Sequence, residues 1–455
     1  MLQPLCSSDH WLQRERSLAP LDRGASLMDP SITPESETRA PWYERAPGYW
    51  LMRAALVGAL AVAAMALTRE MPVASRDIHI ALTACLAVLT TLGCLYTLAS
   101  GILIVPFFRR KTGSPFDCPP ITVLRPLHGH EHALQDNLTS FFHQAYPAPV
   151  QFVFGVHDAQ DPALDTVQAL RLAYPDVDMT IVTDARLHGP NRKISNLMNM
   201  FEHAKHDVLV FADSDVGVAP DYLSNLVAAL QDPGVGLVSC LYRGEADPGL
   251  WPRMSAAASN YHFAPSVVVG LAMKIARPCF GPIIGMRRQT LDAIGGLDRF
   301  ASHLAEDHAI GEAVRDISEC VTIPSFTVSH ACVEPTLRAF LSHKLRTSRT
   351  IRRITPAGHL GSVLTHPLAL ALITALISGG ASWALMLLAA TVVVRLFTGV
   401  QADRALGRTK HGLWILPLCD LLLFGVFIAS FTSSRVEWRG HRFKVDASGL
   451  MTVRE

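Results

Sequence analysis

Charged side chains are scarce in this sequence of 455 residues. Asp, Glu, Lys and Arg make up 17% of it and hydrophobic residues 49%, whereas about 25% of the residues in a typical soluble domain are charged. This deficit excludes a disordered chain and an ordinary cytosolic protein. The nine cysteines contain no CxxC pair, so they fit neither a zinc ribbon nor a disulfide scaffold.

The net charge of +1 conceals two regions of opposite sign. Residues 111–332 hold 15 basic and 24 acidic side chains, whereas residues 333–455 hold 15 basic and 6 acidic ones. An acidic middle and a basic C-terminal part need separate explanations. The first 48 residues are mostly polar and have no periodicity, which predicts a disordered leader over 1–48 rather than a signal peptide.

Two apolar stretches follow the leader. Residues 80–108 contain no charged side chain, and about 20 apolar residues are enough to cross a bilayer. The basic run Arg109-Arg110-Lys111 comes next and belongs on the cytoplasmic side. Residues 54–67 are also apolar but are long enough to span only together with their flanks.

The C-terminal third is apolar again. Residues 360–394 carry no charge and have Ser378-Gly379-Gly380 near their middle, which predicts a helical hairpin, and 413–432 predict another span. Asp420 interrupts this last span, and an acid at membrane depth normally faces a partner or a water-filled cavity. About five spans would place the basic tail outside the cytoplasm, so either one segment only lies in the membrane interface or the positive-inside rule fails here.

These patterns divide the chain into five parts. They are a polar leader at 1–48, a transmembrane region at 49–110, a cytoplasmic domain at 111–355, a second transmembrane region at 356–434 and a basic tail at 435–455.

The hydrophilic block has the pattern of an α/β domain. Its predicted strands are 121–125, 150–156, 178–183 and 207–212, and its predicted helices are 131–142, 161–172 and 193–204. Apolar strands that alternate with helices predict a parallel sheet covered on both faces. Ligands of such sheets bind at the carboxyl ends of the strands, where Asp158, Asp213 and Asp215 fall. The apolar residues 262–286 form either domain core or a surface that rests on the membrane.

The acids in this block suggest a site for a cation. Asp213-Ser214-Asp215 follows a buried strand, and two carboxylates one residue apart can share one hard cation while leaving sites for phosphate oxygens. The alternative is that they cap the helix near Pro220. Asp158 ends an earlier strand, and Glu306-Asp307 opens a helix. Such acids would repel one another without a cation, and one of them could accept the proton of an attacking hydroxyl.

The basic side chains suggest a binding site for a diphosphate. Asn191, Arg192 and Lys193 precede a helix, whose free N–H groups and lysine could face a phosphate. Arg346 and its helical neighbours could bind a pyrophosphate, or could simply flank the membrane. His128, His130 and His132 lack a fourth ligand at zinc spacing, so they form either a metal site or, as we prefer, a polar loop over a nucleotide.

Together these residues resemble a known family. The order Asp158, Asp213-Ser214-Asp215, Glu306-Asp307 and then His343-Lys344-Leu345-Arg346-Thr347, which is similar to a (Q/R)xxRW motif, resembles membrane glycosyltransferases of the GT-A fold. More narrowly it resembles the ceramide glucosyltransferase family, glycosyltransferase family 21, and its bacterial relatives of hopanoid biosynthesis. Arg125-Pro126-Leu127, NLTSFFHQAYP, GVHDAQDPA, GPNRKISNL, FADSDVGVAPDYL and WRGHRF agree as well.

The resemblance implies a GT-A, Rossmann-like domain flanked by transmembrane helices. It implies inverting transfer of one sugar, glucose or N-acetylglucosamine, from a UDP-sugar to a hydroxyl of ceramide or a hopanoid polyol. It also implies a multi-pass protein of a bacterial inner membrane with a cytoplasmic catalytic domain and no nucleic-acid partner.

The resemblance further implies a role for each site residue. Asp158, Asn191, Lys193 and Asp213 would bind the donor, and Asp213 and Asp215 would hold Mg²⁺ or Mn²⁺. Asp307 would be the general base beside Glu306, while His343 and Arg346 would stabilise the diphosphate or line the acceptor site.

Two positions depart from the family pattern. His343 and Thr347 stand where the motif has Gln or Arg and Trp, and loss of the aromatic residue argues against a processive polysaccharide synthase. Such a synthase, a polyprenyl-phosphate sugar transferase of the same fold and a non-catalytic transporter or scaffold are the alternatives.

Overall fold

The computed structural model of the protein describes residues 73–110, 112–129, 131, 133–407, 412–432, 435–438, 441–445 and 450–453. The predicted leader at 1–48 and the apolar run at 54–67 lie outside these residues. Residues 81–455 form one unit by their internal contacts, and the description below concerns this unit.

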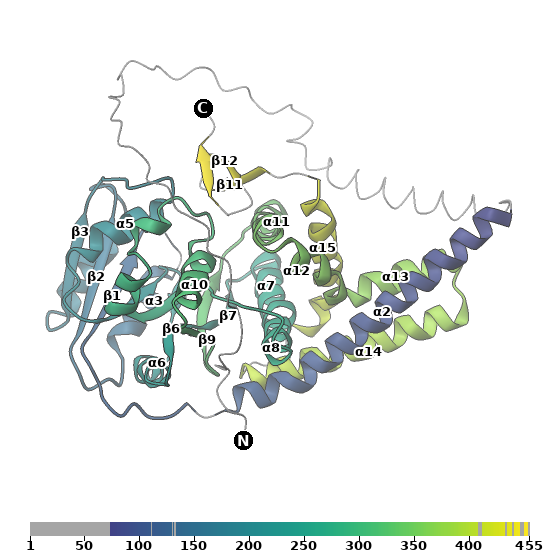
Figure 1. Cartoon of the computed structure of the whole chain (residues 1–455), viewed down its shortest axis with the longest axis horizontal. Coiled ribbons are helices and arrows are strands. Elements are labelled where there is room, and N and C mark those ends of the chain that lie inside the picture. Colours follow the sequence, from purple (N-terminus) through teal and green to yellow (C-terminus); the bar gives the residue numbers. More distant parts are fainter. Residues whose placement is uncertain are drawn as a thin grey trace, which may run out of the picture. The chain divides into compact units, whose positions relative to one another are not determined.

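A seven-stranded sheet forms the centre of the hydrophilic block (Figure 1). Its order is β3-β2-β1-β4-β8-β6-β9. The strands are β1 (Ile121–Pro126), β2 (Val150–Val156), β3 (Asp178–Thr183), β4 (Val208–Ala212), β6 (Val235–Ser239), β8 (Ile283–Arg287) and β9 (Cys320–Thr322). The first four agree with the predicted strands to within a residue.

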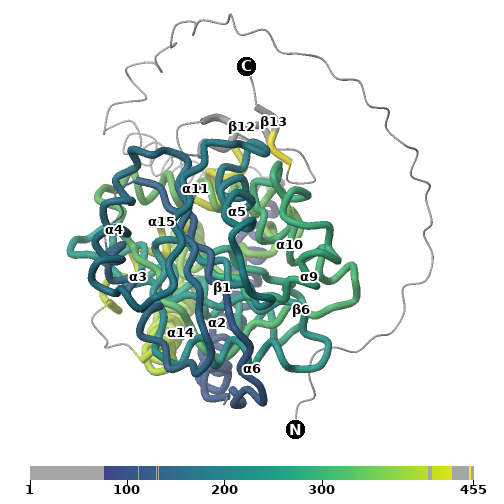
Figure 2. The backbone as a smooth tube through the Cα atoms, turned by 90° about the vertical axis from the view of Figure 1, so that its left-hand side faces the viewer, coloured from purple at the N-terminus to yellow at the C-terminus, as the bar shows by residue number. Residues whose placement is uncertain are grey.

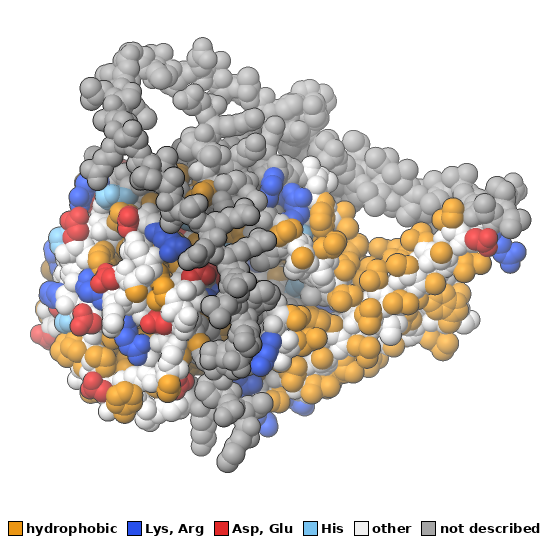
Figure 3. Space-filling model, in the orientation of Figure 1, with side chains coloured by type: hydrophobic (Ala, Val, Ile, Leu, Met, Phe, Trp, Pro, Cys, Tyr) orange, Lys and Arg blue, Asp and Glu red, His pale blue; other side chains and the backbone are white. Residues whose placement is uncertain are grey.

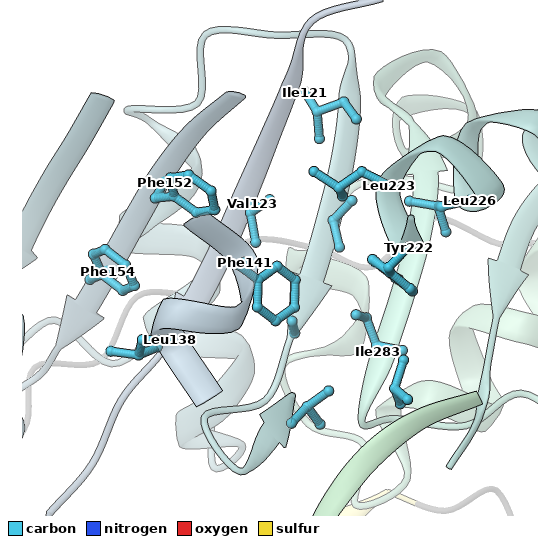
Figure 4. Close-up of a cluster of buried hydrophobic side chains, with 14 of the residues drawn as sticks. Ile121, Val123, Leu138, Phe141, Phe152, Phe154, Tyr222, Leu223, Leu226 and Ile283 are labelled. Carbon is cyan, nitrogen blue, oxygen red and sulfur yellow. The ribbon is translucent and has the colours of Figure 1, made fainter. Parts of the chain in front are cut away.

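Both faces of this sheet are covered by helices. The two-residue period of β1 puts Ile121 and Val123 on one face and Leu124 on the other. The first face packs against α3 (Leu134–Phe142), α4 (Ala163–Ala173) and α6 (Tyr222–Leu230), and the second against α5 (Arg192–Phe201), α9 (Arg288–Ala293) and α10 (Glu306–Asp316). Figure 2 shows α3 and α4 on one side of β1 and α5 and α10 on the other. In Figure 4, Phe141 and Tyr222 point toward each other within the first core.

The sheet is mixed, so the prediction of a parallel sheet was only partly right. β1, β2, β3 and β4 are parallel, but β8 runs antiparallel to both β4 and β6. β8 comes from the apolar residues 262–286, and its first four residues are buried. The domain-core interpretation therefore holds for this part of the segment.

The chain also forms a smaller sheet and a long helical segment, parts of which lie in sequence between strands of the large sheet. The sheet has the order β5-β10-β7, with β5 (Val216–Gly217), β7 (Leu241–Ala246) and β10 (Thr327–Cys332). The segment comprises α7 (Leu250–Ala257), the π-helix η3 (Ala258–Phe263) and α8 (Ala264–Ala272). After β10 follow α11 (Leu337–Ile354), α12 (Pro356–Gly361) and the short η5 (Ser362–Thr365).

Three described helices are long and apolar enough to cross a membrane. They are Arg76–Phe108 within α2 (Val73–Phe108), α14 (Ser382–Ala405) and Leu413–Ser430, which comprises η6 (Leu413–Ile415) and α15 (Leu416–Ser430). Residues 356–365 and α13 (Pro367–Ile377) form a fourth candidate, bent by 66°. Figure 3 shows hydrophobic side chains gathered over α2, α13 and α14, and charged ones over the block with the sheet.

The predicted hairpin is present between α13 and α14. Gly379 and Gly380 form its turn with φ angles of 66° and 76°, a conformation that glycine adopts without strain. Both helices are joined to α2, since Thr90 Oγ1 lies 3.4 Å from Thr374 Oγ1 and Thr398 Oγ1 donates to the Thr97 carbonyl at 2.8 Å.

The basic tail is partly a sheet. β11 (Arg435–Trp438), β12 (His441–Val445) and β13 (Met451–Val453) are antiparallel. The N–H of Met451 donates to the Ser302 carbonyl at 2.8 Å, which joins these strands to the hydrophilic block.

Candidate active site

The Asp213-Ser214-Asp215 turn lies between two strands. It leaves β4 at Ala212 and enters β5 at Val216. The N–H of Asp213 donates to the Pro282 carbonyl at 2.9 Å, and the Asp215 carbonyl accepts from Ala331 N–H at 3.0 Å. The next helix, α6, has Asp221 as its N-cap. The alternative that Asp213 and Asp215 cap this helix is therefore wrong.

Arg125 forms hydrogen bonds with the backbone of this turn. No role was assigned to it from the sequence. Its side chain is fully buried, and NH2 donates to the carbonyls of Asp213 at 2.7 Å, Val216 at 3.0 Å and Ser214 at 3.2 Å. The guanidinium also lies 4.5 Å from the centre of the Phe141 ring. An arginine inside an apolar strand was the available signal, because a buried charge requires partners.

Lys193 joins the turn to the start of α10. Its ammonium nitrogen lies 2.7 Å from Asp213 Oδ1 and 3.1 Å from Glu306 Oε1, and it donates to the Gly281 carbonyl at 3.1 Å. Burial alone would lower the pKa of Lys193, but the carboxylates of Asp213 and Glu306 outweigh it and raise that pKa. Lys193 is therefore charged, and it compensates acids from two separate elements. We call Asp213, Asp215, Glu306 and Asp307 the carboxylate cluster.

Asn191 orients Glu306. It is the N-cap of α5, where its Oδ1 accepts from Ile194 N–H at 3.1 Å. Its Nδ2 donates to Glu306 Oε2 at 3.1 Å and to the His303 carbonyl at 2.8 Å. The predicted donor-binding residues Asn191, Lys193 and Asp213 are thus brought together with Glu306.

Asp307, next to Glu306 in the first turn of α10, has a raised pKa. Burial, and then the neighbouring charge of Glu306, raises the pKa of Asp307 to about 6, close to the pH at which it would act. Its Oδ1 accepts from His308 N–H at 2.8 Å. A side chain at Gly281 would meet Asp307 Oδ2, since a Cβ there would lie 3.1 Å away. This position therefore favours glycine.

Comparison with known proteins identifies the family. The model of glycosyl transferase family 21 matches residues 80–451. This protein belongs to glycosyltransferase family 21. Its mixed sheet, covered by helices and accompanied by apolar helices, is the α/β, GT-A type of domain that the sequence predicts.

Several curated relatives of the family 21 protein are ceramide glucosyltransferases. The Candida albicans protein is 36% identical over 24% of this chain and 22% of its own length. Ceramide glucosyltransferases 1 and 3 of Caenorhabditis elegans are 23% and 25% identical, covering 43% and 48% of this chain. The matches span 42% and 48% of the lengths of these two relatives, so this chain spans less than half of each.

A solved structure is similar over a larger share. The mannosyltransferase PcManGT from Pyrobaculum calidifontis, in complex with GDP-Man and Mn²⁺, has 19% identity and a TM-score of 0.44. The likeness covers 77% of the family 21 chain and 99% of PcManGT.

A second residue that sequence reasoning missed is His330 on β10. Its Nε2 lies 3.3 Å from Asp215 Oδ2. Burial would lower the pKa of His330, but the charge of Asp215 raises it to about 10. The two residues are far apart in sequence, and the antiparallel pairing of His330 with Val216 brings them together. No local sequence pattern predicts this pairing.

The residues present fit a divalent cation. Asp215 Oδ1 is buried and has no hydrogen-bond partner within the described part of the chain, and carboxylate oxygens are the ligands that Mg²⁺ and Mn²⁺ prefer. Among the described residues, no group of three or more His, Cys, Asp or Glu side chains could hold a metal ion. A cation on Asp213 and Asp215 would therefore need the diphosphate oxygens and water as its further ligands.

Two predicted site residues, Asp158 and His343, lie apart from this network. Asp158 is exposed at the end of β2, where its Oδ1 accepts from Gln160 N–H at 2.9 Å. His343 is on α11, with Nδ1 2.6 Å from Glu334 Oε1. Within the described residues, no hydrogen bond or ion pair joins Asp158 or His343 to the carboxylate cluster. Arg346 follows His343 by about one turn of α11.

The predicted histidine loop is only partly described. His130 and His132 lie outside the described residues. His128 Nδ1 lies 3.3 Å from Asp161 Oδ2, and the same carboxylate accepts from Gly129 N–H. Asp161 thus fixes the backbone of this loop.

Proposed function

We propose that the protein transfers one sugar, glucose or N-acetylglucosamine, from a UDP-sugar to a lipid hydroxyl, with inversion at the sugar carbon. The observation that supports this most is the bridge made by Lys193 between Asp213 and Glu306. Lys193 thus joins the turn to which we assign donor binding and the helix to which we assign the base, and family 21 membership fits the same reaction. The acceptor is ceramide or a hopanoid polyol.

Asp307 performs the proton transfer in this mechanism. Its carboxylate takes the proton of the acceptor hydroxyl while the acceptor oxygen attacks the anomeric carbon. The bond between that carbon and the diphosphate breaks, and UDP leaves with the electron pair. Attack from the face opposite to the leaving group gives inversion. Because its pKa is near 6, Asp307 is ionised at neutral pH.

The leaving diphosphate needs positive charge. Mg²⁺ or Mn²⁺, bound through Asp213 and Asp215, would supply it. In this proposal Lys193 and Arg346 add positive charge, and Asp158 contacts the uridine. Arg125 keeps the backbone of the turn in one conformation, so the two carboxylates need no rearrangement when the donor binds.

The catalytic domain lies on the cytoplasmic side of a bacterial inner membrane, and the protein crosses this membrane several times. Arg109 and Arg110 follow α2 directly, as the positive-inside rule requires. The bond from Met451 to Ser302 supports a C-terminal sheet on the same side as the catalytic block. The hairpin α13–α14 then returns to that side, and α15 lies along the interface. In Figure 1, α15 lies beside the ends of α13 and α14 nearer the sheet and runs steeply to both helices, which is in keeping with this.

Transfer by the purified full-length protein tests this function. The protein in nanodiscs is given labelled UDP-glucose or UDP-N-acetylglucosamine, Mg²⁺ or Mn²⁺, and ceramide or a hopanoid polyol, and the products are resolved by mass. We expect one sugar on one lipid. Asp307→Asn should abolish transfer while UDP still binds, whereas Asp165→Asn, an exposed acid on α4, should have no effect. A polymer, a sugar-linked polyprenyl phosphate or no transfer with any donor would contradict the proposal.

A further inference from the structure

Three aromatic side chains form a cluster next to the candidate active site. They are Tyr242 on β7, Phe263 at the end of η3 and Phe280 just before β8. The Tyr242 and Phe263 rings stack with centres 4.8 Å apart, and the Phe263 and Phe280 rings meet edge to face at 5.2 Å. All three are half-buried, so part of their surface is accessible. We call them the aromatic cluster.

One side of the aromatic cluster adjoins the general base. Phe280 immediately precedes Gly281, whose N–H donates to the Asp307 carboxylate and whose carbonyl accepts from Lys193 at 3.1 Å. The loop is fixed at this point, because Phe280 N–H donates to Ser239 Oγ at 2.7 Å. Phe280 is therefore fixed in place, and its neighbour in the sequence, Gly281, contacts Asp307.

A second side adjoins the metal-binding turn. The Tyr242 ring lies 5.1 Å from the His330 ring, and His330 contacts Asp215. Burial, together with nearby Cys332, Asp307 and Asp215, raises the pKa of Tyr242. Its hydroxyl therefore stays protonated and able to donate a hydrogen bond.

A third side continues into the apolar helices. Phe263 and Phe280 pack against a core cluster that includes Ile104 and Phe107 of α2, Ala402 of α14 and Leu416 of α15. Figure 1 shows α7 and α8 between the sheet and the helices α2 and α14. The aromatic cluster is thus the place where apolar surface from the predicted membrane spans meets the carboxylate cluster.

We propose that the aromatic cluster is the acceptor subsite and binds a long-chain lipid alcohol. The first carbons of the lipid lie against the faces of Phe263 and Phe280, and its hydroxyl reaches Asp307. An acceptor with an apolar chain and one reactive hydroxyl needs such an apolar surface. Polar side chains buried against the lipid chain would lack hydrogen-bond partners, which costs free energy. The cluster supplies the aromatic surface that Thr347 does not. This inference rests on the proposed function.

Steady-state transfer to a long-chain alcohol separates this role from simple packing. We expect Phe263→Ala and Phe280→Ala each to raise the KM for the lipid acceptor about tenfold, a change that corresponds to about 1.4 kcal/mol. The KM for the UDP-sugar should change less than twofold. Phe142→Ala is the matched control, since Phe142 is a half-buried ring in another aromatic cluster, 4.9 Å from Phe152, and it should leave both KM values unchanged.

A photo-reactive long-chain alcohol gives a second measurement on the wild-type protein. Its label should fall on peptides that contain Phe263 or Phe280, and unlabelled acceptor should compete. Labelling confined to other helices, or variants with wild-type acceptor KM, would overturn the subsite while leaving the proposed function intact. A wild-type protein that transfers sugar to no lipid alcohol would instead overturn the proposed function.

Discussion

Lys193 and Asp213 form an ion pair, with 2.7 Å between the ammonium nitrogen and Oδ1. A lysine predicted to face a phosphate is thus engaged with a predicted metal ligand. In this arrangement the ammonium compensates the same carboxylate that a divalent cation would compensate, which makes the stability of the protein depend on both.

Lys193→Met should destabilise the protein most strongly when no metal is present. We expect a loss of about 3 kcal/mol in the free energy of unfolding, the lower end of the range for breaking a buried ion pair, because the Asp213 side chain keeps 31% exposure. Added Mn²⁺ should restore part of this loss, since the cation replaces the missing positive charge. Thermal unfolding in detergent with and without Mn²⁺ measures both effects. Lys205→Met, which removes an exposed pair with Asp178, should cost little in either condition.

The rate of transfer should fall as the pH decreases through about 6. Burial and the charge of Glu306 raise the pKa of Asp307 to about 6. If Asp307 is the base, as we propose, it works only when it is deprotonated, so activity is lost on the acid side. Glu306→Gln removes a negative neighbour and should move the acid limb of the kcat/KM profile to lower pH. If the acid limb of the kcat/KM profile does not move in this variant, a group other than Asp307 controls the loss of activity at low pH. The measurement needs donor and metal at saturating concentrations across the pH range.

The first four strands of the block were predicted to within a residue, but the later strands and the contacts between distant strands were not. Val150–Val156 and Asp178–Thr183 are the predicted segments themselves, because an apolar run bounded by turn residues is a local signal. β8 was not predicted as a strand, and its antiparallel direction could not be predicted either, since no local pattern encodes the direction in which a strand pairs. For the same reason His330 was not assigned, because its approach to Asp215 depends on the pairing of β10 with β5.

Arg125→Met should loosen the Asp213–Asp215 turn, to which we assign the metal. The substitution removes three hydrogen bonds to the carbonyls of Asp213, Ser214 and Val216, and buried carbonyls without donors are costly. We expect the affinity of the UDP complex for Mn²⁺ to fall about tenfold, equivalent to about 1.4 kcal/mol. Titration of Mn²⁺ against bound UDP provides the measurement. Arg171→Met, an exposed arginine at the end of α4, is the control, and equal Mn²⁺ affinity in both variants would mean that Arg125 does not position the turn.

Asp420, which we expected to face a partner or a water-filled cavity, has a partner. Arg395 of α14 bonds both carboxylate oxygens of Asp420 on α15, with Nε at 2.6 Å from Oδ2 and NH2 at 2.8 Å from Oδ1. NH1 of the same guanidinium donates to the Tyr261 carbonyl in η3 at 2.8 Å. The pair therefore connects two apolar helices with the segment that carries Phe263.

Arg395→Met should destabilise the protein more than the double variant Arg395→Met/Asp420→Leu. The single change leaves a carboxylate that is 3% exposed without its cation, a loss of about 3–5 kcal/mol, whereas replacing both charges by apolar groups of similar volume is often close to neutral. The fraction of protein that remains monodisperse after heating in detergent ranks the variants, and a double-mutant cycle gives the coupling. A double variant as unstable as the single one would mean that the pair is needed for its bond to Tyr261 rather than for charge balance. In that case transfer to lipid should decline with stability, because the position of η3 would depend on Arg395 itself.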